Sequence, residues 1–428
     1  MTPAFDLLDV PAPNPLRIPD VHERTLPNGL RTLATRRTST PLAEVCLSIP
    51  FAHADAATAV LLAGALSDET RTQDRARAMG GGLSAAVDAD RLRIAGSVLA
   101  DQLPAFLALL EEIVTAPAYP AGEFAITVDN AVQGTIAILA SPAHHVAEAL
   151  NTRMFGDHPY GRPSPRPEEF RETSREAVLA LHAERVVPTG ASVVLAGDFD
   201  PAAALDLVER TLGGWRPGPG VPMRRPGPWL PGKSVVDEPG VSQSLLRMAM
   251  PAPRYAAPDY PALALAAMVF GGYFSSRLVQ NIREDKGFSY SPRSSLLHVA
   301  EAHLTTVSLD VVTANTAAAV EEVHAELTGL ADRPVTPEEL DRARRYSVGT
   351  LRLRLATLTG LAATLCELDL HGLGVSWLGG HDARLAAVTP DEVTAAARRY
   401  LSPEKAVTVL LCDEERAYPG SFRTQSSL

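Results

Sequence analysis

The feature of this 428-residue chain that most constrains its fold is a repeat with a long period. Residues 178–198 combine a helix-like segment, a proline and a short apolar run, and residues 393–413 follow the same plan. Three matches share a spacing of 215 residues: Pro188 with Pro403, Asp198 with Asp413, and Gly134-Thr135 with Gly349-Thr350. Three matches in one register indicate an internal duplication.

A proline-rich stretch separates the two copies. Residues 216–233 hold six prolines, which disfavour helices and central strands and favour a stiff, extended connector. The chain is also too long for one ordinary hydrophobic core. We therefore predict a first domain over 20–215, a linker over 216–233 and a second domain over 234–418.

Both predicted domains mix helices with strands. Residues 105–116, 123–139, 316–330 and 337–355 have helical periodicity. Residues 91–98 and 302–309 alternate as strands do. The fold class is therefore α+β, with two homologous domains, each a sheet backed by helices.

Composition excludes several classes of partner. The content of 46% hydrophobic and 21% charged residues is that of a globular protein, and the net charge of −11 argues against nucleic-acid binding. Three scattered cysteines (Cys46, Cys366, Cys412) favour free thiols over a disulfide framework. We see no signal peptide and no apolar stretch of the ~18–20 residues that span a bilayer. The expected location is cytoplasmic, with no membrane partner.

Five segments together resemble the insulinase/pitrilysin-type zinc peptidases, a family that includes the mitochondrial processing peptidase. They are residues 26–34, the glycine turn 79–91, the His-Pro-Tyr-Gly segment 155–162, and residues 270–278 and 283–290. Their order and spacing carry the resemblance. It implies two homologous α+β domains with mixed, mostly antiparallel sheets. Two such pairs enclose a chamber, with zinc on the first domain of one pair.

The zinc motif of that family is missing here. Its H-x-x-E-H helix corresponds to residues 57–70, where Val60 and Gly64 stand in place of the histidines and Ala63 in place of the catalytic glutamate. The third ligand of the family falls near Gly134 or Thr135, where there is no carboxylate. A catalytic zinc needs three protein ligands and a base, and all are absent together. We therefore expect no metal and no catalytic residue in this chain.

Other candidate sites are weaker. His144, His145 and His158 lie near Asp129 and Glu148 in sequence, but adjacent histidines on a helix point about 100° apart and share a metal poorly. We interpret them, and His53, as solvated or hydrogen-bonded. Residues 80–82 are three glycines without a P-loop lysine, which indicates a turn with positive φ or a close backbone approach.

Arg283 and Tyr290 are the predicted substrate-binding residues. In catalytic relatives an Arg and a Tyr at this spacing contact the peptide near the zinc, through a planar set of donors and a phenolic hydroxyl. The hypothesis is that this chain is a non-catalytic subunit whose homologous partner carries H-x-x-E-H and zinc. The pair would trim or mature peptides. The alternatives are a scaffold or peptide-binding protein without such a partner, and a hydrolase with an unorthodox site, for which we find no nucleophile.

Overall fold

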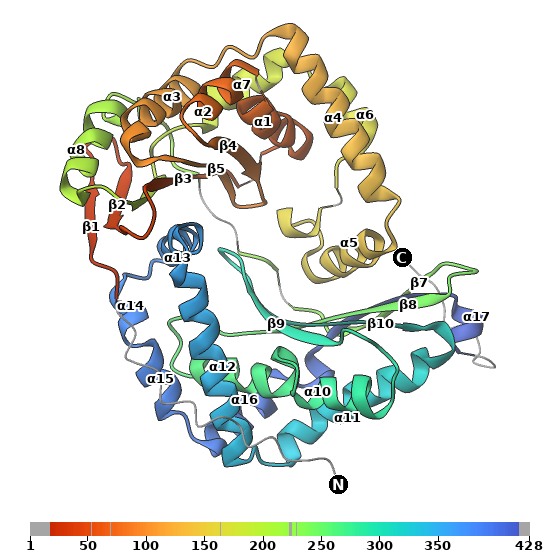
Figure 1. Cartoon of the computed structure of the whole chain (residues 1–428). Helices are drawn as coiled ribbons and strands as arrows, with labels where there is room; N and C mark the ends of the chain where they lie inside the picture. The colour runs from red at the N-terminus through yellow and green to blue at the C-terminus, as the bar shows by residue number, and fades with distance from the viewer. Residues whose placement is uncertain are drawn as a thin grey trace.

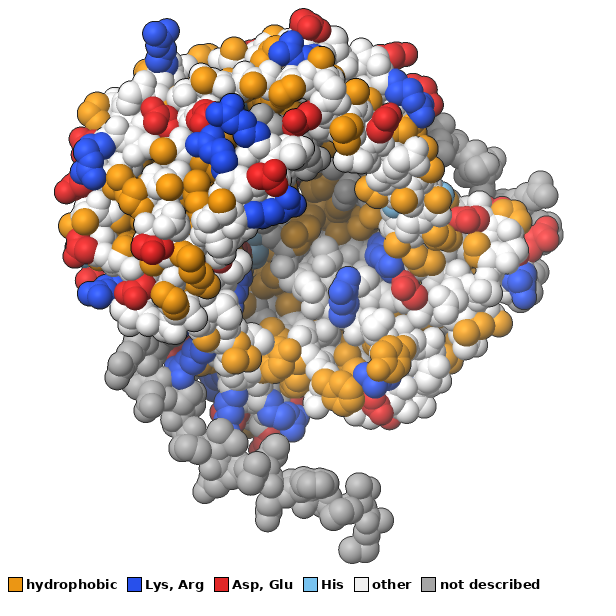
Figure 2. Space-filling view, turned by 45° about the horizontal axis from the view of Figure 1, so that its top comes forward, with side chains coloured by type: hydrophobic (Ala, Val, Ile, Leu, Met, Phe, Trp, Pro, Cys, Tyr) orange, Lys and Arg blue, Asp and Glu red, His pale blue; other side chains and the backbone are white. Residues whose placement is uncertain are grey.

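The computed structural model describes residues 18–52, 54–68, 70–162, 164–221, 225–227 and 229–418. His53 lies outside them. The two halves face each other (Figure 1), and the space-filling view shows a hollow between them (Figure 2).

The first half contains sheet A and most of its helices. Its strands are β1 Val21–Thr25, β2 Arg31–Arg36, β3 Leu42–Pro50, β4 Gly82–Val87, β5 Arg91–Leu99 and β6 Ser192–Gly197. Its α-helices are α1 Ala56–Asp68, α2 Thr70–Ala78, α3 Leu103–Thr115, α4 Ala121–Leu139, α5 Pro142–Phe155, α6 Pro167–Glu172, α7 Arg175–Arg185 and α8 Pro201–Leu212. Two short 3₁₀ turns are η1 Ala100–Gln102 and η2 Pro159–Gly161.

The second half contains sheet B. Its strands are β7 Gly232–Asp237, β8 Gln243–Pro251, β9 Arg293–His298, β10 His303–Val312 and β11 Val407–Cys412. Its α-helices are α9 Tyr260–Ala267, α10 Arg277–Val279, α11 Thr316–Asp332, α12 Pro337–Ala356, α13 Leu358–Leu370, α14 Ser376–Gly379, α15 His381–Ala387, α16 Pro390–Tyr400 and α17 Glu414–Ala417. Two π-helical segments are η3 Met268–Gly272 and η4 Gln280–Asp285, and two 3₁₀ turns are η5 Thr313–Asn315 and η6 Pro403–Lys405.

The two sheets repeat one topology. Sheet A runs β1-β2-β6-β3-β5-β4 and sheet B runs β7-β11-β8-β10-β9, so that β2 to β6 correspond to β7 to β11. In each sheet one parallel pair, β2 with β6 or β7 with β11, joins an otherwise antiparallel ladder. β6 and β11 lie 215 residues apart and are buried along their whole length, which explains their apolar sequences. The α+β prediction and the duplication are confirmed.

The halves exchange one helix each. α5 of the first half packs Val146, Leu150 and Met154 against β11 and β8 of sheet B. α13 of the second half packs against the face of sheet A that carries Leu33 and Val194. In Figure 1 both helices lie between the two sheets. Since each sheet needs a helix from the other half to cover its inner face, the two domains stabilise each other.

Two details differ from the sequence predictions. β7 begins at Gly232, inside the predicted linker. The stretch Tyr260–Asp285 is long and apolar enough to span a membrane by length and composition, which corrects the expectation that no stretch reaches that length. Most of the apolar part of this stretch is buried inside the second half, as in the core helix of a globular domain.

Candidate functional site

The helix that replaces the zinc motif is α1, which packs against β4 and α4. Val60 is 37% exposed, Ala63 is buried and Gly64 is intermediate. None of these three residues has a side-chain atom that could bind a metal or accept a proton. On α4, Gly134 is exposed and Thr135 is buried. Within the described parts of the chain, no group of three or more His, Cys, Asp or Glu could hold a metal ion. The residues present therefore do not fit a catalytic zinc.

The other candidate ligands have their own structural partners. The His145 Nε2 atom lies 2.7 Å from the Leu139 carbonyl oxygen, and the His144 Nε2 atom lies 3.8 Å from Glu148. The ring centroids of His144 and His145 are 6.4 Å apart. His158 Nδ1 accepts a hydrogen bond from the Tyr160 backbone N–H. His145 and His158 are therefore hydrogen-bonded as expected, whereas the buried Nε2 atom of His144 has no hydrogen-bond partner among the described residues.

Arg283 and Tyr290 lie together, although seven positions separate them in sequence. The Arg283 guanidinium carbon is 4.5 Å from the ring centroid of Tyr290 and 4.7 Å from that of Phe274. Arg283 Nε also lies 3.3 Å from a carboxylate oxygen of Glu284. The Tyr290 and Phe274 side chains are 81% and 63% exposed. The result is an exposed stack, Phe274–Arg283–Tyr290, next to the start of the edge strand β9.

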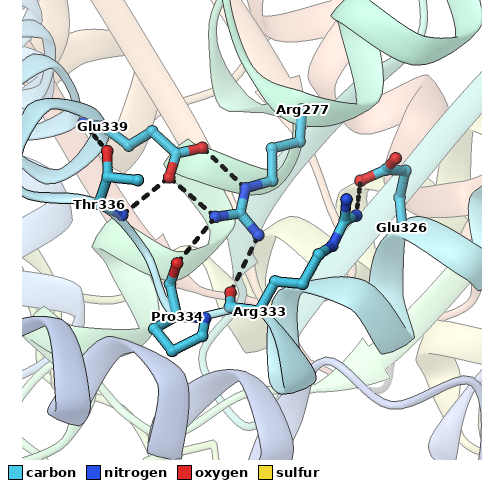
Figure 3. A network of polar contacts seen from close by, with 6 residues as sticks. All are labelled: Arg277, Glu326, Arg333, Pro334, Thr336 and Glu339. Carbon is cyan, nitrogen blue, oxygen red and sulfur yellow. Dashed lines mark hydrogen bonds and ion pairs between the residues drawn. The ribbon is translucent and has the colours of Figure 1, made fainter.

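A polar network holds the helix that carries Arg283 (Figure 3). Arg277, at the start of α10, donates two hydrogen bonds of 2.8 Å to the carboxylate of Glu339. It also donates to the carbonyl oxygens of Arg333 and Pro334. Glu339 in turn accepts from the Thr336 N–H and completes the capping box that begins α12. The Arg277 guanidinium lowers the pKa of Glu339, as a hydrogen-bonded cation does.

A second polar cluster joins the two halves. Tyr160 donates a hydrogen bond of 2.7 Å from its hydroxyl to Asp90, and the hydroxyl accepts from the Glu301 N–H. The other Asp90 oxygen accepts from the Ala300 N–H at 3.0 Å. Residues 299–302 are the turn of the β9–β10 hairpin, so this turn binds the first half. Burial raises the pKa of Asp90 and of Tyr160.

Three histidines lie directly behind that hairpin turn. The Nδ1 atoms of His298 and His303 are 2.9 Å apart, and the His371 ring centroid lies 6.1 and 5.8 Å from theirs. Burial, followed by the nearby imidazoles, lowers the pKa of His298 to about 3 and that of His303 to about 4. Burial also lowers the pKa of His371. The cluster is therefore held neutral at the junction between the halves.

Sequence reasoning missed Phe274, Tyr160 and Asp90. Each lies in a segment that carried the family resemblance, but none was singled out, because their roles depend on partners elsewhere in the chain. Phe274 lies in the turn between η3 and α10 and contacts Arg283 of η4. Tyr160 and Asp90, which are 70 residues apart, meet a hairpin of the other half. The one signal in the sequence was an aromatic residue nine positions before the predicted Arg283.

Comparison with known proteins agrees with this architecture. Residues 172–346 match the family model described as the peptidase M16 inactive domain. An uncharacterized zinc protease of Mycobacterium tuberculosis is 26% identical over 406 residues, which cover 90% of this chain and 92% of that protein.

Two solved structures share the fold. The peptidase M16 inactive domain from Pseudomonas fluorescens superposes with a TM-score of 0.85 at 20% identity, covering 92% of this chain and 98% of its own. A chain of complex III2 from Candida albicans gives a TM-score of 0.77 at 15% identity, covering 92% of this chain and 97% of its own. Residues 172–346 therefore match a peptidase M16 inactive domain, and over most of its length the chain is similar in sequence to a zinc protease and in fold to peptidase M16 structures.

Proposed function

We propose that this chain is the non-catalytic, substrate-binding subunit of a heterodimeric zinc peptidase. A homologous partner with H-x-x-E-H would supply the zinc, and the substrate would be an extended peptide held between the subunits. The observation that carries the proposal is the Phe274–Arg283–Tyr290 stack on a chain that lacks zinc ligands at the family's positions.

The geometry of the stack suits a peptide backbone. Two aromatic rings contact the Arg283 guanidinium, at 4.5 and 4.7 Å, so its plane has a fixed orientation. The N–H groups at its edge are planar donors for a carbonyl oxygen. Tyr290 adds an exposed hydroxyl beside them. β9 is the outer strand of sheet B, and such an edge can pair with an extended peptide.

The proposal is tested by reconstituting this chain with an M16 subunit of its own host that carries H-x-x-E-H. Arg283→Ala should lower kcat/KM by about 10–100-fold, because donors aimed at a carbonyl or its oxyanion contribute most in the transition state. Tyr290→Phe removes only the hydroxyl and should cost about tenfold. Both variants should still assemble with the partner.

The control is Arg345→Ala on α12, whose side chain is 63% exposed and pairs only with Asp341 among the described contacts. It should leave the turnover unchanged. Unchanged turnover in both Arg283→Ala and Tyr290→Phe would overturn the substrate-binding role.

A second test concerns the missing zinc site. The combined change Val60→His, Ala63→Glu and Gly64→His should not create a zinc peptidase, because α4 offers no carboxylate at Gly134 or Thr135. Zinc content by mass spectrometry and peptide hydrolysis both measure this. Stoichiometric zinc with strong hydrolysis would show that these positions are not the ones that correspond to the family's site.

A second candidate function is a scaffold without a proteolytic partner. The fold match with a chain of complex III2 from Candida albicans favours it, since that chain is part of a larger complex. Native mass spectrometry of the complex from the host separates the two. A second subunit of similar mass with one zinc per pair supports the peptidase, whereas the chain alone or a metal-free self-association supports the scaffold.

A further inference from the structure

α13 is fastened to the sheet of the other half at several points. Its apolar side chains pack against Leu33, Val194 and Ala196 on sheet A. Asp369 forms an ion pair with Arg31 of β2, with 2.7 Å between the guanidinium nitrogen and the carboxylate oxygen. The Thr359 hydroxyl donates a hydrogen bond of 2.7 Å to Glu44 of β3. These contacts determine which face of α13 meets which face of β3.

Two cysteines lie on these facing surfaces. Glu44 and Cys46 are two residues apart on β3, so both side chains point to the same face of sheet A. Thr359 and Cys366 are two helical turns apart on α13 and share a face of the helix. Val194 of β6 is the register partner of Cys46, and Cys366 packs against the apolar cluster that contains Val194, so both thiols lie between α13 and sheet A. The two thiols are hydrogen-bond partners, and both side chains are partly exposed. Two thiols that are 320 positions apart in the chain thus meet between the halves.

The surroundings make the two thiols unequal. The hydrogen bond from Cys366, helped by the positive charge of Arg93, lowers the pKa of Cys46. The same hydrogen bond, together with burial, raises the pKa of Cys366. Because the thiolate is the reactive form, Cys46 is the nucleophile of the pair. The third cysteine, Cys412, is buried in sheet B, and burial raises its pKa to about 11.

We propose that Cys46 and Cys366 are a redox site that forms a disulfide between the two halves. With a small-molecule disulfide as oxidant, the Cys46 thiolate attacks one sulfur and releases one equivalent of small thiol. Cys366 then loses its proton and attacks the Cys46 sulfur of this mixed disulfide, which releases the second equivalent. The two protein thiols are oxidised, and one molecule of oxidant is reduced to two thiols.

The bond would fasten α13 to sheet A covalently. α13 could then no longer separate from sheet A. Any opening of the two halves that requires this separation would be blocked. The proposal does not depend on a proteolytic partner, since all the atoms involved belong to this chain.

The test is oxidation of the reduced full-length protein with oxidised glutathione, followed by intact mass measurement and peptide mapping. We expect the loss of two hydrogen atoms, with no glutathione retained, and a linked pair of peptides that contain Cys46 and Cys366. The oxidised protein should unfold at a temperature higher by about 5 °C, because the link restricts the unfolded chain. Stable glutathione adducts, a link to Cys412, or a covalent dimer would overturn the proposal.

Three alanine variants serve as controls. Cys412→Ala should form the disulfide and show the same rise in unfolding temperature as the unchanged protein. Cys46→Ala and Cys366→Ala should lose both. The mass measurement on the unchanged protein tests the proposal even if a variant does not fold. If the unchanged protein does not lose two hydrogen atoms, the redox site is rejected.

Discussion

The three consecutive glycines 80–82, of which the last begins β4, differ in what a side chain would meet at each position. Gly80 has a φ of +75°, which is left-handed and favours glycine. A Cβ on Gly81 would lie 1.7 Å from the Ser97 carbonyl oxygen, whereas a Cβ on Gly82 would meet nothing within 4 Å. The predicted turn with positive φ or a close backbone approach is therefore confirmed in both forms.

Gly81→Ala should destabilise the protein by about 3 kcal/mol or more, because a backbone segment of β5 must move to admit the methyl group. Gly82→Ala, one residue away, is the matched control and should change the free energy of unfolding by less than about 1 kcal/mol. Urea unfolding of both variants measures the difference. Equal effects would show that the close approach to Ser97 is not a constraint.

At the scale of elements, the contact that matters most for the candidate site joins α10 to the start of α12. The Arg277 and Glu339 side chains are 15% and 18% exposed, so their ion pair is largely shielded from water. The pair holds the helical segment that continues to Arg283 against the capping box of α12 (Figure 3). A shielded, bidentate pair of this kind loses more on disruption than an exposed one.

Arg277→Ala should therefore lower the free energy of unfolding by about 2–3 kcal/mol, since Glu339 would remain partly buried without its cation. The control is again Arg345→Ala, which breaks an exposed i,i+4 pair and should cost less than about 0.5 kcal/mol. Thermal and urea unfolding report both values. If the two substitutions cost the same, the network in Figure 3 does not anchor this segment.

At the scale of the whole molecule, the junction between the halves contains the neutral histidine cluster. His298 and His303 border the hairpin turn that binds Asp90, and His371 follows α13. The charged or titratable groups that face the cluster are Asp90, Arg91, Arg254, Tyr255, Tyr260 and Glu367. Protonation there would place positive charge beside a buried contact between domains.

This cluster predicts a loss of stability in acid. The folded protein holds these imidazoles neutral, while the unfolded chain binds protons near pH 6.5. The stabilising contribution is therefore full above pH 6.5 and is lost as the pH falls from about 6.5 towards 4, by roughly 1 kcal/mol per pH unit for each histidine. Asp90 acts in the opposite direction at lower pH, because burial raises its pKa and protonation relieves that cost.

Unfolding temperatures between pH 7.5 and 5 test this prediction. His298→Gln should reduce the slope of stability against pH, whereas His22→Gln, at the surface of β1, is the control and should leave it unchanged. The same slope in His298→Gln and the unchanged protein would place the acid sensitivity outside this cluster.

Much of the architecture could be predicted from the sequence, because the information was local or periodic. The predicted helices over 105–116, 123–139, 316–330 and 337–355 agree with α3, α4, α11 and α12 to within a few residues. The spacing of 215 residues identified β6 and β11 as equivalent strands. The absence of histidines and a carboxylate at Val60, Gly64 and Gly134 is likewise a property of the chain itself.

Only the tertiary structure decided which distant residues meet. It stacked Phe274 on Arg283, exchanged α5 and α13 between the halves, and brought Cys46 to Cys366. No sequence period records these contacts, because they arise when complementary apolar faces exclude water, and burial does not depend on separation along the chain. The sequence alone determined the repeated α+β domains and the loss of the zinc ligands, whereas the folded packing decided the candidate peptide site and the meeting of the two thiols.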